Sequence, residues 1–275
     1  MALTKILIAV KTYPTLSSKY DELVCMAGFL EDGSWIRIYP VPFRKLEPDK
    51  QYSKYDWVEI DIERNTSDFR RESYKPRSLD HGFRLIDHLD TEKDKSWRRR
   101  KEIVLKNVHT NMTELIALAK DKTNYTSLAV FKPKEVLRFE IEAVDREWDK
   151  KKLDKVKANA QQLSLFKNPE KPSEIVKKLP YKFSYGFISD DGKERTLMIE
   201  DWEIGALYWS SLKRHEGNET KACEDVKKKY FDDFAKTKDL YLFLGTTREF
   251  HLIAPNPFVI IGTFHPKKIT QTSLF

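Results

Sequence analysis

The sequence predicts an α+β fold with a β-rich N-terminal module and a mixed C-terminal module. Strand-like alternation dominates the first half, helical periodicity appears in separate stretches, and strands and helices follow one another in segregated runs. The 275 residues suffice for one large or two modest domains, each with its own core. Hydrophobic residues make up 40% and charged residues 34%, which indicates a globular protein with a heavily charged surface.

The N-terminal module, predicted over residues 1–145, begins with strand signals. Apolar runs and apolar-polar alternation predict strands at residues 3–10, 23–30, 35–39 and 55–63. Asp32 and Gly33 supply a tight turn between the second and third of these strands, because Asp-Gly tolerates the positive φ angles of two-residue hairpins. The first strand is short and interrupted by Lys5, which favours a buried strand over a signal peptide.

A helical insertion is predicted over residues 92–121. Its apolar positions recur at steps of three and four, and Asn111-x-x-Glu114 resembles a capping box, which predicts two helices broken near Thr110. The basic run 98–101 fills one helical turn, so it is either a solvated face or a phosphate-contacting patch. Two further strands are predicted after the insertion, at residues 128–131 and 136–144.

Two aromatic residues flank an arginine on one face of the predicted strand 35–39. Such a face is typical of sheets that bind single-stranded nucleic acid, where rings stack on bases and guanidinium groups contact phosphates. Alternatively, the aromatic rings pack beneath the next layer while the arginine reaches water. The predicted nucleic-acid-binding residues are Trp35, Arg37, Tyr39, Arg44, Arg70 and Arg71.

Residues 23–46 carry the run V-C-x-A-G, D-G, W-I-R-I-Y-P. This run resembles the opening of small OB-type barrels in prokaryotic proteins, including a family described as having paired OB domains. The resemblance implies a nucleic-acid-binding barrel in the N-terminal module. It implies nothing about catalysis.

A basic tether is predicted over residues 146–178, and it carries a short apolar peptide. The tether contains ten basic and five acidic residues, so it holds +5 of the net charge of +7. Its prolines and polar composition predict an extended, exposed segment. Within it lies QLSLF, formed by Gln162, Leu163, Ser164, Leu165 and Phe166.

The sequence QLSLF resembles the peptide with which bacterial replication and repair proteins dock on the ring-shaped sliding clamp. In that family the glutamine amide binds a small polar pocket, while the Leu and Phe side chains fill an apolar cleft. A looser copy ends the chain in the predicted tail 267–275, with Gln271, Leu274 and Phe275 at the matching positions. Alternatively, both Leu-Phe peptides pack on their own protein.

The C-terminal module is predicted over residues 179–266. A hairpin is expected from residues 181–188 and 195–199, with its turn at residues 189–192. Residues 200–203 are expected to cap a helix that ends near His215, and a second helix is expected over residues 219–236. Two strands at residues 240–244 and 258–264 complete the predicted fold.

The sequence contains none of the common nucleotide-binding, protease, kinase or deaminase motifs. Glu59, Asp61 and Glu63 alternate on one strand face, where they would hold a divalent metal in a nuclease or line a solvated sheet face. The nuclease pattern would also need a lysine two residues after the second acid, which this strand lacks. The candidate catalytic residues are Glu59, Asp61, Asp201, Glu203, His251 and His265.

No cofactor is predicted, and the two cysteines lie far apart without neighbours at metal-ligand spacing. This cysteine usage predicts a reducing, cytoplasmic location, and no apolar run approaches the length of a membrane span. The leading hypothesis is a prokaryotic DNA-associated protein that docks on the sliding clamp and acts in repair, replication control or defence against phage, with recognition of modified bases. The alternatives are a DNA-processing hydrolase, either a glycosylase or a metal-dependent nuclease, and a non-enzymatic scaffold.

Overall fold

The computed structural model describes residues 3–17, 21–41, 43, 51–78, 83–151, 153–154 and 176–268. The chain forms two compact units, each built from two stretches of sequence. The first unit contains Met1–His88 and Glu142–Lys182, and the second contains Leu89–Ile141 and Phe183–Phe275. The predicted α+β class is confirmed. The predicted module 1–145 contributes residues to both units, since the helical stretch after His88 belongs to the second unit.

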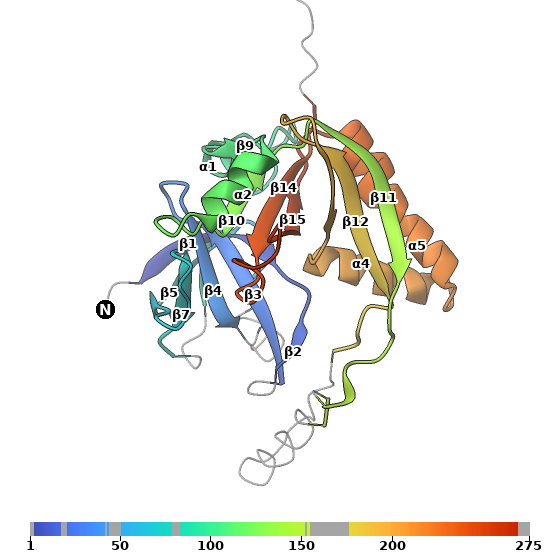
Figure 1. Ribbon diagram of the computed structural model, residues 1–275, viewed down its shortest axis with the longest axis horizontal. Coiled ribbons are helices and arrows are strands. Elements are labelled where there is room, and N and C mark those ends of the chain that lie inside the picture. The colour runs from blue at the N-terminus through green and yellow to red at the C-terminus, as the bar shows by residue number, and fades with distance from the viewer. Residues whose placement is uncertain are drawn as a thin grey trace, which may run out of the picture. The chain divides into compact units, whose positions relative to one another are not determined.

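The first unit is built on a curled sheet of eight strands among the described residues (Figure 1). Its strands are β1 (Thr4–Lys11), β2 (Thr15–Ser17), β3 (Asp21–Phe29), β4 (Trp35–Val41), β5 (Asp56–Ile60), β6 (Ile62–Arg64), β7 (Ser73–Pro76) and β8 (Arg84–His88). The predicted hairpin of β3 and β4 is confirmed, and Gly33 adopts the expected positive φ of 84° in its turn.

The strand order gives the sheet a Greek-key arrangement. β1, β3 and β4 pair in succession, and β5 returns to lie antiparallel beside β1. The resulting order β5-β1-β3-β4 is the order that defines a Greek key. β4 then pairs with the short strand β7 in parallel, which adds the fifth strand of a partly open barrel. This topology agrees with the predicted OB-like module.

The sheet curls because its distant strands are joined through one polypeptide segment. The predicted strand 55–63 is divided into β5 and β6, which are separated only by Asp61. β5 pairs with β1 on one side, whereas β6 pairs with β7, which in turn pairs with β4. The continuous segment from β5 to β6 therefore connects the two ends of the β1-β3-β4 ladder.

The core of the first unit is the sheet interior, and β1 lies at its centre. Residues 6–10 of β1 are buried, as expected for this strand. β1 and β3 approach so closely that a Cβ atom at Gly28 would lie 2.2 Å from the carbonyl oxygen of Leu7. Gly28 is therefore needed for this close approach, because any side chain would force the strands apart.

The second unit combines two sheets with helices. The four-stranded sheet has the order β15-β14-β10-β9, and the three-stranded sheet has the order β11-β12-β13. These strands are β9 (Val108–His109), β10 (Leu128–Phe131), β11 (Glu135–Ala143), β12 (Tyr181–Ile188), β13 (Glu194–Met198), β14 (Tyr241–Thr246) and β15 (Phe258–Phe264). The helices are α1 (Arg98–Val104), α2 (Met112–Lys120), α4 (Trp202–Arg214), α5 (Glu219–Lys227) and the π-helix η3 (Lys228–Ala235).

The helical insertion is divided into α1 and α2 as predicted, with β9 between them. The Asn111 side chain accepts a hydrogen bond from the Glu114 backbone and donates one to the Glu114 carboxylate, which confirms the cap of α2. The basic run 98–101 differs from both sequence interpretations at one position. Arg100 is buried, and its guanidinium donates to the carbonyl of Leu89 with a Nε···O distance of 2.8 Å.

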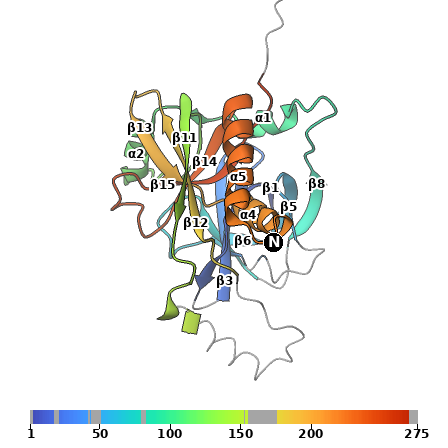
Figure 2. The ribbon, with the colours of Figure 1, turned by 90° about the vertical axis from the view of Figure 1, so that its right-hand side faces the viewer.

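The predicted second helix continues from α5 into η3, which Figure 2 shows as one extended helical segment with α5. Cys223, Val226, Tyr230 and Phe234 form its buried side, as expected from their spacing. The Tyr185 hydroxyl of β12 donates to the backbone carbonyl of Tyr230 at 2.5 Å. The Tyr230 carbonyl thus has a side-chain donor within the π-helix, where backbone hydrogen bonds span five residues instead of four.

The predicted docking peptides, residues 162–166 and 271–275, lie outside the described residues. Within the described ranges, no helix is both long enough and apolar enough to cross a membrane.

Asp191 joins the β12–β13 turn to the start of α2, and its replacement tests this contact. Its carboxylate accepts from Arg195 Nη2 at 2.6 Å, from the Thr113 hydroxyl at 2.6 Å and from the Ser189 hydroxyl at 2.6 Å. We expect Asp191→Ala to lower the free energy of unfolding by about 2 kcal/mol, measured by urea titration at neutral pH. Asp190→Ala, at an exposed neighbour, is the matched control and should change it by less than about 0.5 kcal/mol.

The same pair of variants also tests a pH dependence. The hydrogen bonds from Arg195 hold the pKa of Asp191 far below its usual value. A carboxylate with a lowered pKa stabilises the fold above its unfolded-state pKa, near 4, and this contribution disappears as the pH falls through the folded-state value. The stability difference between wild type and Asp191→Ala should therefore shrink below about pH 4. A difference that stays constant in acid would contradict this role.

Candidate nucleic-acid interface

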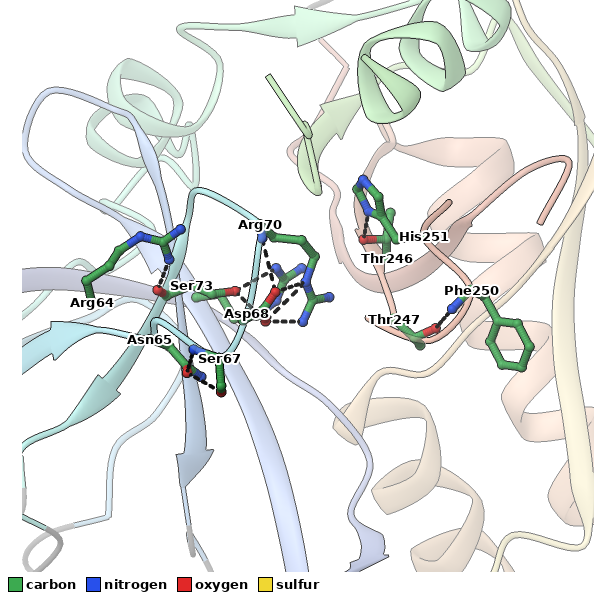
Figure 3. Close-up of polar contacts among 11 residues, drawn as sticks. Arg64, Asn65, Ser67, Asp68, Arg70, Ser73, Thr246, Thr247, Phe250 and His251 are labelled. Carbon is green, nitrogen blue, oxygen red and sulfur yellow. Dashed lines mark hydrogen bonds and ion pairs between the residues drawn. The ribbon is translucent and has the colours of Figure 1, made fainter. Parts of the chain in front are cut away.

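A buried cluster of charged residues joins β4 to the loop between β6 and β7. The Arg70 guanidinium donates to both carboxylate oxygens of Asp68, with Nε···Oδ1 at 2.9 Å and Nη2···Oδ2 at 2.6 Å. The Ser73 hydroxyl donates to Asp68 at 2.8 Å and accepts from Arg37 Nη1 at 3.4 Å. All four side chains belong to buried residues. Figure 3 shows Asp68, Arg70 and Ser73 converging between the loop and the sheet.

The backbone and side chains of the loop reinforce this attachment. The backbone N–H of Arg37 donates to the Glu72 carbonyl at 2.7 Å, and Arg64 donates to the Ser73 carbonyl. Within the loop, the Ser67 hydroxyl donates to the Asn65 side chain at 2.7 Å (Figure 3). The loop therefore has a fixed conformation against β4.

The electrostatics of the cluster follow from burial and from the two arginines. Burial and the nearby charge of Arg70 lower the pKa of Arg37. Burial by itself would raise the pKa of Asp68, but the hydrogen bonds and charge of Arg70 outweigh it and lower that pKa to about 2. Asp68 is thus ionised at neutral pH and offsets part of the positive charge buried with it.

The cluster determines which side chains the loop presents to solvent. Asp68 and Arg70 point inward, while Phe69 and Arg71, which alternate with them, are exposed. Tyr39 of β4 is also exposed, at 40%, and Phe69 at 37%. The first unit therefore presents two aromatic rings and one guanidinium from β4 and the loop attached to it. We call Tyr39, Phe69 and Arg71 the exposed aromatic-arginine surface.

The structure places the predicted nucleic-acid-binding residues in different environments. Tyr39 and Arg71 are exposed, as expected. Arg37 and Arg70 are buried, so the expectation that Arg37 lies on an open face with the aromatic residues is wrong. The hydrogen bonds within the cluster provide the partners that make this burial tolerable. Trp35 is half-buried against Phe29, with ring centroids 4.0 Å apart. Arg44 lies outside the described residues.

The candidate carboxylates of the first unit form ion pairs along β5 to β7. Glu59 lies 3.3 Å from Arg84, and Asp61 lies 3.2 Å from Arg77. Glu63 accepts from Lys75 and Arg77, and the hydrogen bond from Lys75 lowers its pKa. Among the described residues, no three His, Cys, Asp or Glu side chains gather in a way that could hold a metal ion. In this structure, Glu59, Asp61 and Glu63 are therefore carboxylates on the sheet that form ion pairs with neighbouring cations.

Asp201 and Glu203 lie at the start of α4, as expected for capping residues. Asp201 is fully buried and accepts from the Glu203 backbone N–H at 3.4 Å. Burial raises the pKa of Tyr230 well above its usual value, and the charges of Asp201 and Glu203 raise it further. The buried Asp201 and the exposed Glu203 thus both influence the buried Tyr230 phenol of the second unit.

The two candidate histidines are held by different partners. His251 is fully buried between the Thr246 hydroxyl and the Ala119 carbonyl, each 2.7 Å from a ring nitrogen. His265 stacks on Phe234, with ring centroids 3.6 Å apart and the planes 14° from parallel. The contacts of His251 and His265 therefore hold both side chains in place within the second unit.

The ends of the predicted tether are tied together within the first unit. The Trp148 indole donates to the Val176 carbonyl at 2.8 Å, and Lys178 donates to the Glu147 carbonyl at 3.1 Å. The Tyr13 hydroxyl donates to the Lys177 carbonyl at 2.8 Å, which fixes this junction beside the end of β1. The segment that carries QLSLF therefore starts and ends at one place on the first unit.

Sequence reasoning missed Phe69 and the inward direction of Arg70. Arg70 and Arg71 are both predicted to bind nucleic acid, although Asp68-x-Arg70 contains an acid and a base two residues apart. Such spacing allows both side chains to lie on the same side of an extended segment, which leaves the residue between them facing outward. The same observation would have predicted an exposed phenylalanine.

Comparisons with known proteins provide family matches but no activity. A model for a domain of unknown function, DUF8758, matches residues 2–106, and a model for another, DUF8757, matches residues 108–275. No curated protein matches the sequence. A solved structure described as a murine DNA binding protein bound with ds DNA aligns with 99% of this chain and 100% of its own, at 8% identity and a TM-score of 0.28. A TM-score this low does not indicate a shared fold.

Asp68→Ala tests the buried cluster. The substitution leaves two buried guanidinium groups without their carboxylate, so we expect the free energy of unfolding to fall by about 3 kcal/mol at pH 7. Because the pKa of Asp68 is lowered to about 2, its contribution is complete above about pH 4 and is lost as the pH falls towards 2. Asp61→Ala removes a more exposed carboxylate and should cost under about 1 kcal/mol. Equal losses in the two variants, measured by urea titration, would argue against a special role for Asp68.

Proposed function

This chain belongs to the family of the domain of unknown function DUF8757, which assigns it no activity, and from its own residues we propose that it binds nucleic acid and docks on the bacterial sliding clamp. The single observation that carries the proposal is the placement of QLSLF. This peptide lies in a segment whose ends are fixed together by Trp148, Val176 and Lys178. A docking peptide on a segment anchored at one place can bind the clamp while the first unit keeps its own fold.

The arrangement of the first unit supports nucleic-acid binding. Its Greek-key order and curled sheet match the description of OB folds, in which strands and adjoining loops bind oligonucleotides. The exposed aromatic-arginine surface lies on one such strand, β4, and on the loop before β7. Aromatic rings stack on bases without strong sequence preference, and an adjacent guanidinium contacts phosphate. We propose that this surface binds single-stranded DNA.

The two parts of the proposal reinforce each other through effective concentration. A clamp encircles DNA, so a docked protein meets DNA at a much higher local concentration than a free one. Weak binding by a small surface would then suffice for function. We propose DNA repair, replication control or defence against phage as the biological use, with recognition of modified bases. The last part of this proposal would be abandoned if the purified protein neither bound nor altered modified DNA.

Replacing Leu165 and Phe166 with alanine tests clamp docking. We expect the double variant to lose more than about a hundredfold in affinity for a purified bacterial clamp, because two apolar side chains no longer enter the cleft. Surface plasmon resonance with immobilised clamp gives the affinity. A double variant at Asn168 and Glu170, just beyond the peptide, is the matched control and should bind like wild type. A chain that lacks residues 271–275 tests the second copy separately.

The clamp experiment has a decisive negative result. If the wild-type chain shows no affinity for the clamp, QLSLF is not a docking peptide in this protein. The proposal would then retain only nucleic-acid binding by the first unit.

Phe69→Ala and Arg71→Ala test the nucleic-acid surface. We expect each to weaken binding of single-stranded DNA by about tenfold, measured by fluorescence anisotropy. Arg71→Ala should also reduce the dependence of affinity on salt, since one phosphate contact is lost, whereas Phe69→Ala should leave it nearly unchanged. Leu3→Ala removes an exposed apolar side chain elsewhere in the unit and is the control. Unchanged affinity in both test variants would remove this surface from the proposal.

A further inference from the structure

The loop between β14 and β15 exposes three large apolar side chains within four residues. Phe250 is 49% exposed, Leu252 is 44% exposed and Ile253 is 72% exposed. Exposing such side chains together is unfavourable unless they contact something. We call these three residues the apolar knuckle.

The residue inside the knuckle, His251, fixes it to the body of the second unit. A carbonyl oxygen only accepts hydrogen bonds, so Nε2 of His251 donates to Ala119. In the neutral ring, Nδ1 then accepts from the Thr246 hydroxyl, a contact that Figure 3 shows. The imidazole is fully buried, while the residues on both sides of it are exposed.

Backbone hydrogen bonds hold the rest of the loop. Thr246 N–H donates to the Ser127 carbonyl at 3.0 Å, and Ala254 N–H donates to the Phe250 carbonyl at 3.0 Å. The Phe250 N–H donates to the Thr247 hydroxyl at 3.4 Å, and its ring projects away from the Thr246–His251 pair (Figure 3). A knuckle that is already ordered loses little conformational entropy on binding.

Exposed cations lie in the segments that contact the knuckle. Arg248 precedes it in the same loop, and Lys120 and Lys122 are exposed on either side of the α2 end, where Ala119 accepts from His251. The acids are Glu249 and Asp121, and Asp121 accepts from Thr123 and Asn124 within its own turn. The formal charge of these five residues is +1, from three cations and two anions. Apolar side chains at a loop tip can enter a stack of bases, and exposed cations in the adjoining segments can contact the flanking phosphates.

We propose that the apolar knuckle is a wedge that enters a base step of duplex DNA, with Ile253 at its tip. This inference rests on the proposed function, because it assumes that the protein works on DNA. Apolar side chains that enter a base step unstack it and kink the duplex, and neighbouring cations bind the flanking phosphates. Because the knuckle is ordered before it binds, its binding energy can offset the cost of unstacking the two bases. The partner class of the second unit is thus duplex DNA.

The test uses the full chain and a short duplex that carries one 2-aminopurine, a base whose fluorescence increases when it unstacks. Wild type should increase the fluorescence on binding. The double variant Leu252→Ser/Ile253→Ser should remove most of this increase and weaken duplex binding by about tenfold. Leu3→Ser, at an apolar residue 49% exposed in the first unit, is the matched control. Unchanged circular dichroism and thermal unfolding verify that the variants fold.

The outcomes separate this inference from the proposed function. If wild type binds the duplex without a fluorescence increase, or if the double variant retains the increase, the wedge is overturned while DNA binding stands. If wild type binds neither duplex nor single-stranded DNA, the wedge and the nucleic-acid part of the proposed function both fail, while clamp docking is decided by its own experiment. The double variant is also tested on anionic vesicles of phosphatidylcholine and phosphatidylserine and on the clamp. Loss of either interaction with unchanged fluorescence would assign the knuckle to a lipid surface or to a protein.

Discussion

The parallel pairing of β4 with β7 is the constraint on which the first unit depends. β1, β3, β4 and β5 can pair as a simple antiparallel ladder, but the sheet curls only when the chain after β6 returns to β4. The Asp68–Arg70 pair holds this return, since Ser73 at the start of β7 donates to Asp68 and accepts from Arg37 of β4. Burying three charged groups is costly unless each finds partners. The exposed positions of Phe69 and Arg71 follow from the same contact.

Local signals in the sequence predicted most elements because these elements depend on local physics. Alternation identified the long strands, Asp32-Gly33 identified the hairpin, and Asn111 with Glu114 identified the start of α2. Asp61 did not stand out as a break, because a polar residue there fits the alternation of one continuous strand. The change of direction between β5 and β6 depends on pairing with two different strands, β1 and β7, which lie far apart in the chain.

The functional surfaces were harder to predict than the fold, because charged residues were assigned to solvent by default. Arg37, Arg70 and Arg100 are buried; the acceptors of Arg37 and Arg100 come from other parts of the chain, and that of Arg70 is Asp68, two residues before it. The sequence gives no sign of these partners, apart from the closeness of Asp68 to Arg70. Conversely, Phe69 and Ile253 are exposed although their residue types favour burial. Periodicity assigns side chains to faces of an element, but the neighbouring elements decide which face is covered.

The junction of Trp148 with Val176 has a consequence for how the protein can vary. Its two sides are held together by groups that do not belong to the intervening segment, so the first unit does not rely on that segment for closure. For a chain between fixed ends, doubling the length costs only about 0.6 kcal/mol of closure entropy. Insertions, deletions or a different peptide between residues 155 and 175 would therefore leave the sheet intact. The junction thus makes the segment a replaceable insertion, whose sequence can change independently of the fold.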